Sequence, residues 1–128
     1  MSYYLSKVVP LAFESAVAKV KDSLAREGFG VLTDIDVQAT LHSKLGVEFP
    51  RYRILGACNP ALAHRALQME DKLGVLLPCN VIVRDAASGG VEVAAIDPVT
   101  SMERTGNPSL AAVATEVRER LERAVQAV

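Results

Sequence analysis

Two cysteines, each followed by an asparagine, are the residues of this sequence whose types and spacing could support chemistry. Cys58-Asn59 ends one apolar segment, Cys79-Asn80 begins another, and His64 lies in a predicted helix between them. Two thiols and an imidazole could form a soft metal site or a redox pair. The alternative is that both cysteines are packed as small hydrophobic side chains, because cysteine is among the residues most often buried.

The surroundings of the two cysteine-asparagine pairs differ. Cys58 lies just before a predicted helix start, where partial positive charge favours the thiolate form. Asn59 is expected to cap that helix, with Pro60 at its first position. Asn80 has no capping role, so we expect it either to hydrogen-bond a neighbouring loop or to face a ligand. A metal centre is not predicted, because there is no Cys-x-x-Cys pair and His42 lies on another element.

A second group of ionisable residues consists of Asp34, Asp36 and Lys44. The two carboxylates could hold a cation or act as an acid and base pair. They could equally form a solvated strand end in which Asp36 caps the following helix. Lys44 lies in the last turn of that helix, where its charge suits the helix dipole. The sequence therefore identifies no catalytic residue in this group.

Apolar periodicity and capping residues predict the elements that must position these side chains. Alternating or continuous apolar residues predict strands at 3–9, 29–35, 52–57, 80–85 and 91–96. Stripes at helical spacing, closed in three cases by a glycine, predict helices at 10–27, 37–45, 60–73 and 108–125. Asp97-Pro98 is expected to be a turn, and residues 102–105 to be irregular or a short strand. The hairpin-linked strands predict an α+β domain, with a mostly antiparallel sheet backed by helices.

Length and composition restrict the class of protein. The chain has 128 residues, half of them hydrophobic, and we expect one domain over residues 1–128. The net charge of −1, from 14 basic and 15 acidic residues, argues against a nucleic-acid partner. No apolar run approaches the roughly 20 residues that span a bilayer, and the first nine residues lack a signal-peptide pattern. We therefore expect a cytoplasmic location with reduced cysteines and no membrane partner.

Six segments resemble the bacterial and archaeal family known as domain of unknown function 302. They are YRILGACNP at 52–60, LLPCNV at 76–81, DIDVQATL at 34–41, KLGV at 44–47, ALAHRAL at 61–67 and IDP at 96–98. The resemblance covers nearly the whole chain. It implies a curved sheet like one repeat of the TATA-box-binding protein, in the order β-α-β(4)-α with an inserted helix, and a homodimer. It implies no activity, and DNA binding does not follow from the fold alone.

Three hypotheses of function remain open from the sequence. The first is a dimeric small-ligand-binding module with a pocket edged by Cys58, Asn59, His64, Cys79 and Asn80. The second is a thiol-dependent redox protein or enzyme that uses Cys58 or Cys79. The third is a dimer whose special residues serve only packing and partner interaction. The balance of polar residues at strand ends favours binding over catalysis, and the sequence identifies neither a ligand nor a cofactor.

Overall fold

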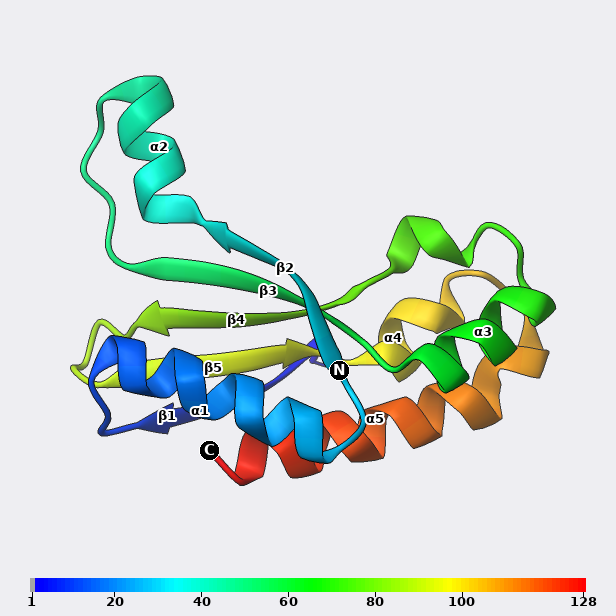
Figure 1. Cartoon of the computed structure of the whole chain (residues 1–128). Helices are drawn as coiled ribbons and strands as arrows, with labels where there is room; N and C mark the ends of the chain where they lie inside the picture. Colours follow the sequence, from blue (N-terminus) through cyan, green and yellow to red (C-terminus); the bar gives the residue numbers. More distant parts are fainter. Residues whose placement is uncertain (1) are drawn as a thin grey trace.

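The five strands form one antiparallel sheet, in the order β1-β5-β4-β3-β2. The computed structural model describes residues 2–128, so Met1, the first residue of the predicted domain, lies outside it. The strands are β1 (Tyr4–Val9), β2 (Gly30–Asp36), β3 (Tyr52–Cys58), β4 (Cys79–Asp85) and β5 (Val91–Ile96). The α-helices are α1 (Phe13–Arg26), α2 (Val37–Leu45), α3 (Pro60–Met69), α4 (Pro98–Glu103) and α5 (Ala111–Gln126). The predicted α+β class is confirmed, with β1-α1-β2-β3-β4-β5-α5 as the β-α-β(4)-α frame (Figure 1).

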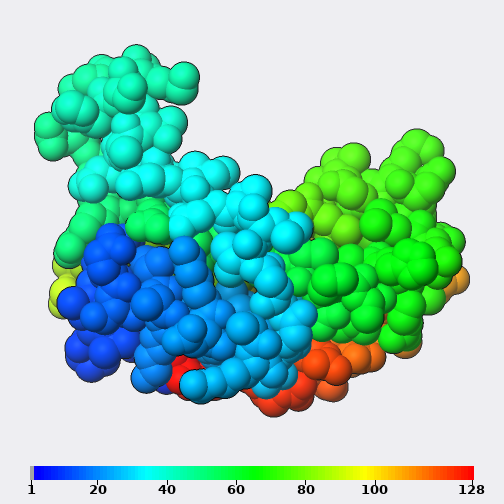
Figure 2. Space-filling model, viewed as in Figure 1, coloured from blue at the N-terminus to red at the C-terminus, as the bar shows by residue number. Residues whose placement is uncertain are grey.

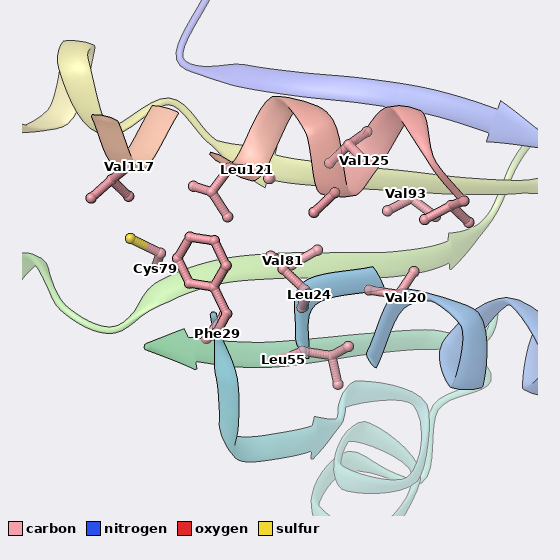
Figure 3. Packing of buried hydrophobic residues seen from close by; sticks show 14 of the residues in the cluster. Val20, Leu24, Phe29, Leu55, Cys79, Val81, Val93, Val117, Leu121 and Val125 are labelled. Atoms are coloured by element: carbon pink, nitrogen blue, oxygen red, sulfur yellow. The ribbon is translucent and has the colours of Figure 1, made fainter. Parts of the chain in front are cut away.

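Helices α1 and α5 pack together against one face of the sheet (Figure 1). The predicted apolar stripes of both helices are buried, which confirms their helical spacing. They meet the alternate strand residues Leu55, Val81, Val83 and Val93, all of which are fully buried. Figure 3 shows this core, with Phe29 and Cys79 at one end of it. The hydrophobic core therefore lies mainly between the sheet and these two helices, and it extends to Leu62 of α3 and Met102 of α4.

The opposite face of the sheet has no helix packed along it. Residues paired directly across antiparallel strands point to the same face. Ile82 pairs with Ile54 on one side and with Ala94 on the other, and these residues alternate with the buried ones. The same face therefore carries the residues in register with them, namely Tyr4, Tyr52, Asn80, Arg84, Glu92 and Ile96. We call this surface the open face.

A close approach of three segments occurs where Gly56 lies on the open face. An added Cβ at this position would collide with the hydroxyl of Thr33 and the ring of Pro78. The register of β2 against β3 is also irregular between Val31 and Thr33. Gly56 thus allows the irregular edge strand and the start of β4 to come together over β3.

Helix α2 and the loop after it form an arm, residues 37–50, that projects from the end of the sheet (Figure 1). Its predicted caps are confirmed, since the Asp36 carboxylate accepts from the backbone N–H of Ala39 and Gly46 adopts a left-handed conformation. Its apolar stripe, however, is only partly covered: within residues 2–128, Val37 and Leu41 are half-buried, Leu45 is exposed and no residue of α2 is buried. The arm is therefore ordered locally but packs only weakly against the rest of the described chain.

Two element predictions are corrected. Helix α3 ends at Met69 rather than Leu73, and a 3-10 turn, η1 (Leu73–Leu76), follows it. The reason is tertiary, because the side-chain amide of Asn107 donates to the Met69 carbonyl oxygen at 2.9 Å. The predicted turn at Asp97-Pro98 and the irregular segment after it form helix α4 instead.

The sequence pattern does not predict helix α4, because six residues are too few to show a helical period. The helix nevertheless begins at a recognisable cap. The Asp97 carboxylate accepts from the backbone N–H of Val99, and Pro98 occupies the first turn. The final helix shows a smaller difference. Asn107-Pro108 opens a 3-10 turn, η2 (Pro108–Leu110), and the α-helix proper begins at Ala111.

Within residues 2–128, no helix combines the length and the apolar character that crossing a bilayer requires.

Replacing Leu55 with alanine tests the position of the core. Because this side chain is fully buried under the helices, we expect the free energy of unfolding to fall by about 2–5 kcal/mol. Urea denaturation would measure the change. Leu32→Ala is the matched control, since Leu32 is 67% exposed and its truncation should cost less than about 0.5 kcal/mol. Equal losses in both variants would contradict the assignment of Leu55 to the core.

Candidate functional site

The two cysteines lie close together at one end of the core. Cys58 ends β3 and Cys79 begins β4, in adjacent strands. Together with Asn59 they line an apolar cavity of about 30 Å³. A cavity of this size holds one or two water molecules but no organic ligand. The cysteine edge predicted from the sequence therefore exists, but it encloses no ligand-sized space.

The Cys79 thiol is held in its uncharged form by its surroundings. Burial, with a smaller contribution from neighbouring Cys58, raises the pKa of Cys79 from the ordinary 9.0 to about 11. Figure 3 shows its sulfur beside the Phe29 ring, near Val117. Both cysteines are free thiols, and Cys58 is the more accessible of the two. Cys79 consequently has the surroundings of a core residue rather than of a nucleophile.

The other three predicted site residues lie in different places. Asn59 caps α3, as predicted, by accepting a hydrogen bond from the backbone N–H of Leu62 at 3.3 Å. His64 is exposed on the surface of α3. Asn80 lies on the open face, because it follows Cys79 directly in a strand and successive residues point to opposite faces. The five residues therefore do not border one cavity.

The carboxylates of β2 are engaged in structural contacts. Asp34 accepts from the Arg53 guanidinium at 2.7 Å and from the Lys21 ammonium group at 3.0 Å. The hydrogen bond from Arg53 is the main reason that the pKa of Asp34 is lowered to about 2. Asp36 caps α2, and Lys44 lies in its last turn. Within residues 2–128, no three histidine, cysteine or acidic side chains are grouped as metal ligands would be.

A wide surface hollow lies on the open face. It is a cavity of about 560 Å³ over strands β1, β5, β4 and β3. Aliphatic side chains form its floor, with the small Ala94 between Ile82 and Ile96. All three tyrosines of the chain line it, together with the three polar residues Asn80, Arg84 and Glu92. This combination of an apolar floor and a few convergent polar groups is typical of small-molecule sites.

Contacts between the lining residues order the walls of this cavity. The rings of Tyr3 and Tyr4 meet edge to face, with 5.1 Å between their centroids. Arg84 donates from Nε to Glu92 Oε1 at 2.7 Å across the β4–β5 pair. The Tyr52 ring lies 6.2 Å from that of Phe49, at the base of the arm. Through Tyr52, the wall of the cavity therefore contacts the arm.

Sequence reasoning singled out Asn80 but missed the rest of this cavity. The alternation of Asn80, Ile82 and Arg84 along β4 is a signal that could have marked one face of the strand. The tyrosines carry no such signal, because Tyr3 and Tyr4 precede Tyr52 by almost fifty residues. Only the strand order, which places β1 beside β5 and β5 beside β4, brings these side chains over one floor.

Comparison with known proteins identifies the family of the chain and a similar solved structure. A family model described as "Domain of unknown function DUF302" matches residues 5–128. The crystal structure of an uncharacterized conserved protein DUF302 from Bacillus stearothermophilus is similar, with a TM-score of 0.93 and 26% sequence identity. The match covers 99% of this chain and 98% of that one. The search of curated proteins finds no significant match.

The two thiols are expected to differ in their rates of alkylation. A pKa of about 11 instead of 9.0 lowers the thiolate fraction of Cys79 about 100-fold at neutral pH, and burial restricts access further. Iodoacetamide at pH 8 should therefore modify Cys58 first, with Cys79 protected until the protein unfolds. Peptide mapping by mass spectrometry would measure both rates, and urea-unfolded protein is the control. Faster labelling of Cys79 in the folded protein would contradict this description.

Proposed function

The chain belongs to the DUF302 family, whose name assigns no activity, and from that premise we propose that it is a homodimeric module that binds a small molecule on its open face. The observation that carries the proposal is the cavity of about 560 Å³ lined by all three tyrosines. This volume lies in the range of about 300–1,000 Å³ that small-molecule sites occupy. The cysteine cavity, at about 30 Å³, offers no comparable space.

The composition of the open face supports binding rather than packing within the chain. In a sheet with one covered face, the uncovered face normally carries polar side chains. Here the centre of that face is formed by Ile54, Ile82, Ala94 and Ile96. An apolar floor without a cover gains free energy when a ligand or a second protein surface removes it from water.

The projecting arm supports the homodimer. Leu45 is 68% exposed, and Val47 and Phe49 are also exposed to a large extent. A helix of nine residues is marginal in water by itself, so α2 needs an apolar surface against which to pack. Figure 2 shows a hollow between the arm and the segment that contains η1. We assign the arm of a second copy to this hollow, because an arm and a hollow on each copy form a self-complementary pair with twofold symmetry.

A thiol-dependent reaction has less support. One of its two candidate residues, Cys79, is buried and protonated at neutral pH. Cys58 borders only the small apolar cavity, where a substrate has no room. A dimer without a ligand is the remaining alternative, and the two experiments below separate it from the proposal.

Filling the cavity should abolish ligand binding without damage to the core. In Ala94→Phe, a ring would project from the floor into the open-face cavity. We expect a library of small aromatic and heteroaromatic compounds to shift amide NMR signals of β4 and β5 in the unmodified protein, with affinities reduced at least tenfold in this variant. Ala18→Phe, on the exposed surface of α1, makes the same change elsewhere and should leave binding intact. Absence of any compound that acts on β4 or β5 would overturn the binding proposal.

Charges on the arm should separate the dimer. We expect size-exclusion chromatography with light scattering to give twice the 13.7 kDa of the chain at tens of micromolar. The double variant Leu45→Glu and Val47→Glu places charges on the surface assigned to the partner, and a monomer is expected. Leu67→Glu is the matched control, because Leu67 is an exposed leucine on α3, outside the arm. A monomeric unmodified protein, or an arm variant that remains dimeric, would overturn this part of the proposal.

A further inference from the structure

We propose that the open-face cavity selects an uncharged, flat ring system whose edge offers a hydrogen-bond donor beside an acceptor, as in lactams and cyclic amides. This inference rests on the proposed function, since it specifies the ligand of the same cavity. Three features of the lining carry it: the balance of charge, the positions of the aromatic rings and the unpaired amide of Asn80.

The charges of the lining favour an uncharged ligand. Arg84 and Glu92 are the only formally charged residues that line the cavity, and they form an ion pair with each other at 2.7 Å. Arg84 donates in addition to the backbone carbonyl of Asp85. An anion or cation that enters would lose water without finding a free counter-charge, which is costly. A neutral molecule avoids that loss.

The positions of the aromatic rings favour a flat ligand. Tyr4 lies on β1 and Tyr52 on β3, with β5 and β4 between them. Three strand spacings of about 4.8 Å place these two strands about 14 Å apart. Between them the floor is aliphatic and lowest at Ala94. One or two fused rings fit this width, lying on the floor with their edges or faces toward the tyrosines.

The amide of Asn80 favours a ligand whose edge carries a hydrogen-bond donor beside an acceptor. A primary amide offers an N–H donor and a carbonyl acceptor side by side, and it pairs with a ligand edge that presents the complementary groups. Within residues 2–128, the Asn80 side chain makes no recorded hydrogen bond, unlike the capping asparagines Asn59 and Asn107. Asn80 is an exposed residue that lines the cavity, so its amide is accessible from the open face.

Three bicyclic probes separate these features. They are 2-quinolone, which is neutral and carries the lactam edge, quinoline, which lacks the donor, and quinoline-2-carboxylate, which is charged. Titration of each into the full-length protein, followed by amide NMR shifts, would give the affinities and the residues contacted. We expect 2-quinolone to bind at least tenfold more tightly than either analogue, with shifts centred on Asn80, Ile82 and Ala94.

Variants of Asn80 assign the preference to its amide. Asn80→Leu should remove the advantage of 2-quinolone over quinoline while quinoline binds as before, because the floor and the tyrosines are unchanged. Asn80→Asp keeps the shape but loses the donor, and should weaken 2-quinolone in the same direction. Gln68→Leu, an exposed amide on α3 outside the cavity, is the matched control and should change nothing.

The possible failures are distinguishable. If quinoline or quinoline-2-carboxylate binds to β4 and β5 as tightly as 2-quinolone, the inferred ligand class is overturned while the small-molecule site stands. If none of the three probes shifts the signals of these strands, the inferred ligand class is overturned, and the library screen decides separately whether the proposed binding function stands. The comparison of probes on the unmodified protein does not depend on how the variants fold.

Discussion

Helices α1 and α5 pack on the same face of the five-stranded sheet, and within residues 2–128 no helix packs along the other face. Most features of the molecule depend on this one-sided cover. The buried residues of β3, β4 and β5 alternate with residues that point away from the helices, so half of each central strand lacks a packing partner. Those outward positions are largely apolar at the centre, whereas an uncovered sheet face normally carries polar side chains.

The arm is subject to the same constraint. Residues 37–50 fold into a capped helix and a loop, but in the described part of the chain the apolar side chains of this segment are at most half-buried. Capping stabilises the ends of a short helix without providing the tertiary contacts on which most helical stability depends. The Phe49 ring of the arm contacts the Tyr52 ring of the cavity wall. A partner that covered the arm would therefore also border the cavity.

The candidate residues that have a structural role can be distinguished from the one that has none. Asn59 and Asp36 cap helices, Asp34 is paired with Arg53, and Cys79 fills the core. Each of these has a local explanation that requires no ligand. Asn80 is different, because it carries a polar amide on an apolar surface and neither caps a helix nor closes a loop. Its surroundings are therefore the part of the molecule on which the proposed binding function depends.

The ends and order of most elements follow from the sequence, because capping and apolar periodicity act over a few residues. The exceptions are informative. Helix α3 stops early because Asn107, almost forty residues away, bonds the Met69 carbonyl, and α4 is too short to have a period. Local patterns cannot report contacts of this kind.

The sequence by itself determined the α+β class, the buried stripes of α1 and α5, and the caps at Asp36 and Asn59. It placed Cys79 and Asn80 together at the edge of one pocket, whereas β4 begins at Cys79 and its alternation sends the two side chains to opposite faces. Only the tertiary structure decided which face the helices cover, and hence that Cys79 lies in the core and Asn80 in the cavity. The physical reason is that strand order is set by contacts between distant segments: it joins Tyr3 and Tyr4 to Tyr52 across β5 and β4, and no local pattern encodes that arrangement.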